Sequence, residues 1–378
     1  MQRTERYYNR CSPSFEASPQ FAFWGSNDEM VEPMKILHII AGAERGGAES
    51  CAVDTIKALH DAGIEQTVIS RPHTAFLTLV KDCTIDHHIL SFNRILKWTQ
   101  KAKIHTIIKN EKPDLVHCWL NRAASFTPYQ KTLPVLGWFG GYYDLKYYKS
   151  CDFFMGVTKD IVRYIGDVTR TPDRAYVGHA FGTLETMGEV KKSDYGISDT
   201  TKVVLMLSRM HWKKGVDLLI NAASKIDDVV FLIAGDGPEM EKYRAQARAL
   251  NLERRVLFLG WCKDRLGLLS IADVCVLPSR YEPFGIVIPE SWFARVPLVA
   301  TKADGAKHYV NHEEDGLLVD IDDCEGLIQA LQRALHDEAL RAQLIKGGTT
   351  MYKKLFNRKS VITSLIKSYQ DMIRRLQC

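Results

Sequence analysis

Short apolar runs alternate with amphipathic stretches along almost the whole chain, and this alternation limits the fold more than any other feature. The apolar runs have the length of strands. The stretches between them repeat apolar residues every three to four positions, as helices packed on one face do. Strands that alternate with helices in this way form parallel sheets that the helices cover. The sequence therefore predicts an α/β protein.

The alternation occurs twice, which predicts two doubly wound domains. In the first half, the expected strands are Lys35–Ile40, Gln66–Ser70, Asp114–Cys118, Val135–Trp138, Phe153–Val157 and Ala175–Val177, and the expected helices are Ala48–Asp61, Ile95–Asn110 and Lys159–Ile165. In the second half, the strands are Val203–Leu207, Val229–Ala234, Val256–Leu259, Val274–Pro278 and Pro297–Ala300, and the helices are Val216–Ala223, Pro238–Leu250, Arg265–Ile271, Ile286–Ala294, Cys324–Ala334, Glu338–Lys346 and Lys359–Gln377.

Local composition sets the expected domain boundaries. Residues 1–33 have no apolar period and lack the basic start and apolar core of a secretory signal, so we expect a disordered N-terminal extension or a misplaced start codon. Residues 34–182 then form an N-terminal Rossmann-like domain, and the turn-rich segment 183–201 is a linker. Residues 202–356 form the C-terminal domain, and residues 357–378 form a final helix with an apolar stripe.

Composition also excludes several classes of protein. No apolar run approaches the roughly 18 residues of a membrane span. A net charge of +5 in 378 residues is too small to make nucleic acid the expected partner. The nine cysteines are scattered without a C-x-x-C pair, which disfavours a disulfide framework or a zinc site and favours a reducing cytoplasm. The D-x-D pattern at Asp320 and Asp322 precedes a predicted helix, so we expect helix capping there rather than a metal site.

The most informative segment runs from Pro278 to Glu290 with the sequence PSRYEPFGIVIPE. It follows a predicted buried strand, turns at Gly285 and enters a helix. Backbone amides at Phe284–Val287 would face a phosphate, whose charge the helix dipole favours. Glu290 could then accept hydrogen bonds from ribose hydroxyls, and Glu282 from hydroxyls of a sugar. The alternative is an ordinary carboxylate at a helix start and a solvated glutamate in a turn.

Two basic residues, Arg209 and Lys214, follow the first predicted strand of the second half. Cations at the edge of a ligand crevice can neutralise a diphosphate leaving group. Gly235 and Gly237 close a neighbouring strand with a tight turn, which suits a backbone that approaches a nucleotide. Either cation alone could be a surface residue, but the pair is in register with the glutamate motif. The pattern therefore predicts a phosphate-bearing ligand.

With these residues identified, residues 34–378 resemble the retaining glycosyltransferases of family 4, the glycosyl transferases group 1 type, which adopt the GT-B fold. The resemblance implies two doubly wound Rossmann-like parallel-sheet domains that face each other across a cleft. It also implies a nucleotide-sugar donor on the C-terminal domain, an acceptor on the N-terminal domain and transfer with retention. The matching positions are Arg209, Lys214-Gly215, Gly235-Asp-Gly-Pro238, Phe258-Leu-Gly260, Ala272 to Ser279, Glu282-x-Phe-Gly to Glu290, Pro297 to Ala300, Gly305 and Asp315 to Val319.

The resemblance implies a role for each matching residue. Arg209, Lys214 and Glu282 are the expected catalytic residues. His117 is a further candidate, although many relatives carry their histidine two positions later, where Trp119 stands here, and His117 could instead be a buried strand residue. His179 could contact the donor or lie at a domain hinge. The expected donor-binding residues are Gly46 and Gly47 of a GGAE loop, Arg209, Lys214, Gly235, Gly237, Glu282, Phe284, Gly285, Ile286 and Glu290.

We therefore expect a cytoplasmic hexosyltransferase that moves a sugar from a UDP- or GDP-sugar to a hydroxyl of a glycan or lipid-linked saccharide. By resemblance, the acceptor belongs to bacterial lipopolysaccharide or surface polysaccharide synthesis. Relatives of this type generally work without a metal, so we expect no metal and no other cofactor. Two alternatives stay open, a GT-B nucleotide-sugar epimerase and a non-catalytic sugar-nucleotide-binding protein.

A basic segment in the first half indicates how a membrane could be contacted. Residues 93–112 carry six basic side chains against the single acid Glu111. The segment is either a solvated helix face packed on its sheet or a basic helix that contacts anionic lipid headgroups peripherally. The basic residues are Arg94, Lys97, Lys101, Lys103, Lys109 and Lys112, and the expected apolar side consists of Ile95, Leu96, Ile104, Ile107 and Ile108, with Trp98 interleaved.

Overall fold

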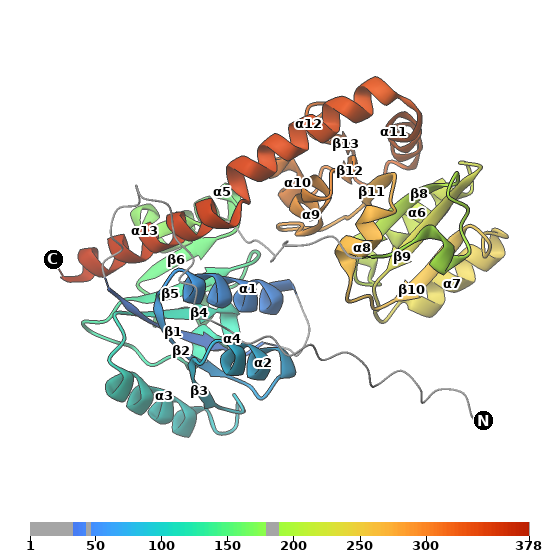
Figure 1. Ribbon diagram of the computed structural model, residues 1–378. Helices are drawn as coiled ribbons and strands as arrows, with labels where there is room; N and C mark the ends of the chain where they lie inside the picture. The colour runs from blue at the N-terminus through green and yellow to red at the C-terminus, as the bar shows by residue number, and fades with distance from the viewer. Residues whose placement is uncertain (1–32, 43–46, 179–188, 378) are drawn as a thin grey trace, which may run out of the picture. The chain divides into compact units, whose positions relative to one another are not determined.

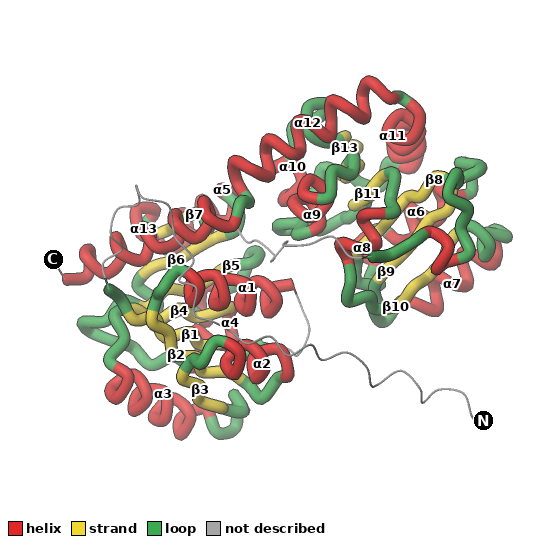
Figure 2. Tube along the Cα trace, in the orientation of Figure 1, coloured by secondary structure: helices red, strands yellow, loops and turns green. Residues whose placement is uncertain are grey.

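The computed structural model describes residues 33–42, 47–178 and 189–377. The predicted disordered extension at 1–33 lies outside these residues except for Pro33, and Gly46, His179 and the first part of the predicted linker also lie outside them. From Met34 onward the chain forms one compact unit. This unit contains two parallel sheets, as the alternation of the sequence predicts (Figures 1 and 2).

The N-terminal sheet has seven strands in the order β3-β2-β1-β4-β5-β6-β7. All neighbouring strands in it run parallel. The middle strands Leu115–Trp119 and Val135–Phe139 are buried along their whole length, because helices cover both faces of a parallel sheet. The strands are β1 (Lys35–Ile40), β2 (Glu65–Ser70), β3 (Asp86–Ile89), β4 (Leu115–Trp119), β5 (Val135–Phe139), β6 (Phe153–Gly156) and β7 (Ala175–Val177), and the helices between them are α1 (Gly47–Asp61), α2 (Thr74–Asp82), α3 (Lys97–Glu111), α4 (Leu120–Phe126) and α5 (Lys159–Thr169).

The C-terminal sheet has six strands in the order β10-β9-β8-β11-β12-β13, again all parallel. In each sheet the chain winds outward from a central strand in one direction and then returns to wind in the other. The strands are β8 (Lys202–Leu207), β9 (Val229–Ala234), β10 (Val256–Gly260), β11 (Val274–Leu277), β12 (Leu298–Thr301) and β13 (Leu317–Val319), and the helices are α6 (Val216–Ala223), α7 (Met240–Ala249), α8 (Arg265–Ser270), α9 (Val287–Phe293), α10 (Asp304–Tyr309), α11 (Cys324–His336) and α12 (Glu338–Leu355).

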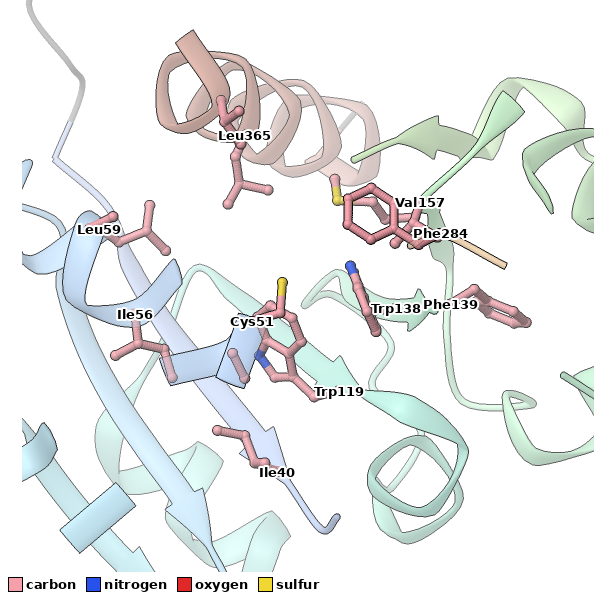
Figure 3. Close-up of a cluster of buried hydrophobic side chains, with 14 of the residues drawn as sticks. Ile40, Cys51, Ile56, Leu59, Trp119, Trp138, Phe139, Val157, Phe284 and Leu365 are labelled. Carbon is pink, nitrogen blue, oxygen red and sulfur yellow. The ribbon is translucent and has the colours of Figure 1, made fainter. Parts of the chain in front are cut away.

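The last helix, α13 (Arg358–Gln377), packs against the N-terminal domain, as its apolar stripe and the family resemblance predict. Tyr369 of α13 forms a buried hydrogen bond with His117 of β4. In Figure 3, Leu365 of α13 points toward the cluster that contains Trp119 and Trp138. The second half of the chain is thus tied to the first by a helix whose apolar side is buried.

The structure corrects one sequence prediction about the helices and adds detail to the predicted linker. Helix α3 begins at Lys97, two residues later than expected, and Ile95 and Leu96 are exposed instead of lying on the apolar side. The predicted linker contains a 3-10 helix, Lys192–Tyr195, and the Nζ atom of Lys192 donates to the carboxylate of Asp273 in the C-terminal domain at 3.4 Å. The described part of this segment is therefore folded against the C-terminal domain.

Candidate active site

The candidate site lies at the point where the strand order of the C-terminal sheet reverses. There β8 and β11 pair directly, with Val204 opposite Val274 and Leu205 opposite Cys275. The loops that leave the carboxyl ends of these two strands therefore emerge side by side. In doubly wound folds, ligands bind outside the strand ends at this reversal. The loop after β8 carries Arg209 and Lys214, and the loop after β11 carries Glu282.

Lys214 and Glu282 form an ion pair across the two loops. The Nζ atom of Lys214 lies 2.6 Å from Oε2 of Glu282, and the two side chains are only 24% and 12% exposed. The hydroxyl of Ser279 also approaches the same carboxylate oxygen, at 3.4 Å. Arg209, in the same loop as Lys214, is exposed and makes no ion pair with the described residues. The site thus holds one compensated cation and one uncompensated cation.

Arg280, which lies inside the motif but was not predicted as a site residue, joins the loops that carry this pair. Its guanidinium donates to both carboxylate oxygens of Asp217 at 2.8 and 2.7 Å, and to the carbonyl of Trp212 at 2.8 Å. Its Nε donates to Asp322 at 2.6 Å, and its backbone amide donates to the carbonyl of Lys213 at 2.8 Å. A bidentate Arg–carboxylate contact fixes geometry as well as charge. The Arg280 contacts therefore hold the Lys214 turn against the Glu282 turn.

Glycines allow these strand-end loops to pack closely. Gly215 has φ +68°, and a Cβ atom there would lie 1.9 Å from the carbonyl oxygen of Pro278. Gly235, with φ +137°, would place a Cβ atom 1.8 Å from the carbonyl oxygen of Ser208. At Gly237, a Cβ atom would lie 2.4 Å from the carbonyl oxygen of Met210. The Gly235–Gly237 turn therefore supports the loop that contains Arg209, which is a packing role compatible with the predicted approach to a nucleotide.

The Glu282 turn rests on the start of α10. The amide of Gly305 donates to the carbonyl of Glu282 at 2.7 Å, and a Cβ atom at Gly305 would lie 2.4 Å from the carbonyl oxygen of Phe284. The ring of Phe284 is buried and makes edge contacts with Tyr309 and Phe356. The side chain of Phe284 is therefore part of the core, which leaves only its backbone for the predicted contact with a donor.

After this turn, Gly285 adopts φ +80° and the half-buried Ile286 precedes the first residue of α9. Helix α9 begins at Val287, one residue later than expected. Pro289 lies inside its first turn, where a missing amide costs little. The segment thus has the strand–turn–helix form that its sequence predicts.

Glu290 of α9 is a buried carboxylate, 1% exposed, that faces Arg265 of α8. Oε1 lies 2.8 Å from an Arg265 nitrogen in an ion pair, and neither carboxylate oxygen has a hydrogen-bond partner among the described residues. Burial raises the pKa of Glu290 to about 7, against the opposing effect of the Arg265 charge. Glu290 can therefore accept two hydrogen bonds that the described residues do not supply.

His117 lies in the core of the N-terminal domain rather than on an open surface. Its Nδ1 is 2.7 Å from the hydroxyl of Tyr369, and its ring stacks on Trp119 at 4.4 Å between centroids. Burial, and then the nearby His38, lowers the pKa of His117 well below its usual value. The cavity that it lines has a volume of about 20 Å³, which holds about one water molecule and no sugar. This placement favours the buried-strand interpretation, and a catalytic role for His117 stays a prediction.

The other predicted residues are placed as follows. Gly47 is the first residue of α1, immediately after the undescribed residues 43–46 that include Gly46. The predicted capping role of Asp320 and Asp322 is wrong, because Asp320 pairs with Lys302 and Asp322 with Arg280. Asp323 caps α11 instead, by accepting from the amide of Gly326.

Comparisons with known proteins identify the family. Residues 188–351 match the family described as glycosyl transferases group 1. The chain is 30% identical to the lipopolysaccharide core biosynthesis glycosyltransferase LpsD of Rhizobium meliloti, over 90% of this chain and 98% of that protein. It is also 30% identical to LpsE of the same organism, which carries the same description, over 88% and 98% of the two chains.

A solved structure shares the fold. Anabaena HepE, in complex with UDP and glucose, superposes with a TM-score of 0.76 at 20% identity, over 89% of this chain and all of that chain. The two parallel-sheet domains are thus those of GT-B glycosyltransferases. Together with the two Rhizobium relatives, which match nearly their full length, these findings show that the chain is a glycosyltransferase and belongs to the glycosyl transferases group 1 family.

Proposed function

We propose that this enzyme transfers a hexose-type sugar, with retention, from a UDP- or GDP-sugar to a hydroxyl of a lipopolysaccharide core or related surface polysaccharide intermediate. The observation that carries the donor assignment is the Lys214–Glu282 pair at the strand reversal, with Arg209 beside it. These groups match a sugar attached to a diphosphate, because cations suit the phosphates and a carboxylate suits sugar hydroxyls.

In the donor complex, we expect Lys214 and Arg209 to contact the diphosphate. Charge accumulates on the β-phosphate oxygens as the bond to the anomeric carbon breaks, and two preplaced cations stabilise that charge. Glu282, released from Lys214, would accept hydrogen bonds from hydroxyls of the transferred sugar. The pair thus supplies both charges of the site, each neutralised by the other until the donor arrives. We propose that this positive charge replaces a metal ion, so that donor binding needs no divalent cation.

Glu290 would hold the nucleoside. Its two carboxylate oxygens are buried and have no hydrogen-bond partner among the described residues, and the two hydroxyls of a ribose can donate to both. Because Arg265 covers this carboxylate, we expect its guanidinium to move when the ribose binds. Unpartnered buried acceptors cost stability, and a ligand that satisfies them recovers that cost as affinity.

The chemical step follows from the family. The bond between the anomeric carbon and the β-phosphate oxygen breaks, and an acceptor oxygen forms a new bond to the same face of that carbon. The acceptor proton passes to the departing phosphate, so that atoms and charges balance without an enzyme nucleophile. The described residues around Lys214 and Glu282 would orient this exchange and stabilise the leaving charge.

The acceptor assignment rests on the relatives LpsD and LpsE, whose descriptions name lipopolysaccharide core biosynthesis. We propose that the enzyme works at the cytoplasmic face of the membrane on a glycan or lipid-linked saccharide. Family membership favours this transfer over the epimerase and the non-catalytic alternatives.

An activity assay tests the proposal. The purified protein is given radiolabelled UDP- and GDP-sugars with lipid extracts or truncated lipopolysaccharide cores, and the anomeric configuration of the product is determined by NMR. We expect label in the glycan from one donor class with the donor's configuration retained. An inverted product would overturn retention. Isomerised sugar nucleotide without any transfer would identify an epimerase instead.

A further inference from the structure

The segment that leads into α3 presents apolar side chains to solvent. Ile95 is 89% exposed, Leu96 51% and Trp98 86%, although residues of these types are usually buried. Figure 1 shows α3 at the periphery of the N-terminal domain, beside β3. The inner side of the same helix is buried through Ile104 and Ile108. The exposed residues are thus not the core-facing side of α3.

The segment is held in this orientation by contacts on its other side. The ring of Phe92 is buried and makes an edge contact with Phe126 at 5.5 Å between centroids. The side chain of Gln100 donates to the hydroxyl of Ser91 at 3.0 Å. The side chain of Asn93 accepts from the amide of Ile95 at 2.9 Å. These contacts therefore fix the turn in a conformation that leaves the apolar residues exposed.

Basic side chains surround the exposed residues without acidic partners. None of the six basic residues of segment 93–112 has a carboxylate within ion-pair distance among the described residues. The one acid, Glu111, is paired with Lys35 at 3.0 Å and with His88 at 3.0 Å. Partial burial, and then the charge of Lys97, lowers the pKa of Lys101. The positive charge of this surface is therefore not neutralised by the described residues and can interact with another molecule.

Apolar and basic groups also share one side of the helix. Trp98, His105 and Lys109 are spaced seven and four positions apart, which places them on one face of α3, and all three are exposed. Lysines beside an exposed Trp and Ile are the composition of helices that lie in the interface of an anionic bilayer. A surface that binds nucleic acid would carry basic groups with fewer exposed aliphatic residues than this one.

We propose that this surface, formed by Arg94, Ile95, Leu96, Trp98, Lys101 and Lys109, docks the enzyme on a membrane that contains anionic lipid. Ile95, Leu96 and Trp98 would enter the headgroup region, and the basic residues would contact lipid phosphates. No helix among the described residues is long and apolar enough to cross a membrane, so this contact is peripheral. The inference adds a partner to the proposed function, and it rests on that function only in placing the acceptor at the same membrane.

Vesicle co-sedimentation tests the surface without any turnover. The full chain is mixed with phosphatidylcholine vesicles, or with vesicles that also contain phosphatidylglycerol, at low and high salt. We expect binding to the anionic vesicles that weakens as salt rises, because screening acts on exposed charges. The triple variant Ile95→Ser, Leu96→Ser and Trp98→Ser should bind at least about tenfold more weakly, and so should Lys101→Glu with Lys109→Glu.

A matched variant controls for loss of apolar surface in general. Val168 and Leu250 are 54% and 40% exposed in other parts of the chain, and changing both to Ser should leave vesicle binding unchanged. Equal thermal stability of all variants would show that they are folded. Absence of binding to anionic vesicles, equal binding by the triple variant and the wild type, or binding to an oligonucleotide in place of vesicles would overturn the proposal. Failure of glycosyl transfer would leave these results unaffected.

Discussion

Lys214 and Glu282 lie 68 positions apart in the sequence, yet their charged atoms are 2.6 Å apart at the strand reversal of the C-terminal sheet. The pair is partly shielded from solvent, so each charge is compensated by the other more strongly than at an open surface. A donor that brings a diphosphate for Lys214 and hydroxyls for Glu282 can replace both halves of the pair. In the proposed function, the contact would therefore connect the stability of the free site with its affinity for a donor.

Lys214→Ala should lower turnover by at least about 100-fold, the scale of one lost group that stabilises developing charge. The matched control is Lys213→Ala, because Lys213 belongs to the same turn but its ammonium lies over the ring of Tyr281, 4.7 Å from the centroid. Steady-state kinetics with the preferred donor would measure both. Near-normal turnover in Lys214→Ala, or the same loss in Lys213→Ala, would remove Lys214 from the mechanism.

Arg280→Lys should lower kcat by about tenfold or more, because a lysine cannot bind both oxygens of Asp217 and also Trp212 and Asp322. Asp217→Asn should give a comparable loss. The double variant should be little worse than either single one, since the two residues act as one unit. Arg248→Lys, at an exposed position of α7, is the control. Additive losses in the double variant would show that Arg280 acts independently of Asp217.

Glu290 should make the stability of the free enzyme fall as pH rises. Its pKa is raised from 4.5 to about 7, so the folded protein binds this proton more tightly than the unfolded chain between those values. The stabilisation, up to about 3 kcal/mol, is fully present below pH 4.5 and lost as pH reaches 7.

Chemical unfolding at pH 5 and pH 7.5 measures this effect, with Glu290→Gln compared to the wild type. The variant should lack this part of the pH dependence, and its affinity for the preferred nucleotide should fall. Glu253→Gln, at an exposed position, should behave as the wild type. If the free energy of unfolding of Glu290→Gln depends on pH as strongly as that of the wild type, the Glu290 carboxylate of the wild type is not buried in solution.

Tyr369→Phe should lower the free energy of unfolding by about 1 kcal/mol, because it removes only the hydrogen bond to His117. His117→Ala should cost more, since it also leaves a cavity beneath α13. If His117 has only a packing role, the turnover of the folded variants stays near that of the wild type. A roughly 100-fold slower turnover in His117→Ala, with normal turnover in Tyr369→Phe, would support the predicted catalytic role instead.

The order of strands and helices could be predicted because most elements carry a clear apolar period. Val216–Ala223 and Val229–Ala234, for example, are predicted at the bounds that the structure shows. Some of the missed elements are short or lack such a period. Strand β3 has the sequence DHHI and is nowhere fully buried, and α10 has six residues with a glycine at the second position. Their place depends on tertiary contacts rather than on local sequence.

The site could be predicted only in part. The motif placed Arg209, Lys214 and Glu282 at neighbouring strand ends, and the structure brings Lys214 and Glu282 into contact. Arg280 and Arg265 were missed, because their partners Asp217 and Glu290 come from other elements. The signal for Arg280 was its position inside the motif, two residues before Glu282. The exposure of Ile95 could not be predicted, because the helical period continues through it although the helix begins later.

The proposed donor site at Lys214 and Glu282 is best tested by thermal shift with UDP, GDP, ADP, CMP and their common sugar conjugates, all in EDTA, on the wild type and on Lys214→Ala. A ligand at roughly 100 times its Kd adds about 2.7 kcal/mol of stability. We expect a selective rise with UDP or GDP and its conjugates that is much smaller in Lys214→Ala. If the wild type responds to none of these nucleotides, with Mg²⁺ or Mn²⁺ replacing EDTA as well as without, the donor does not bind at this site.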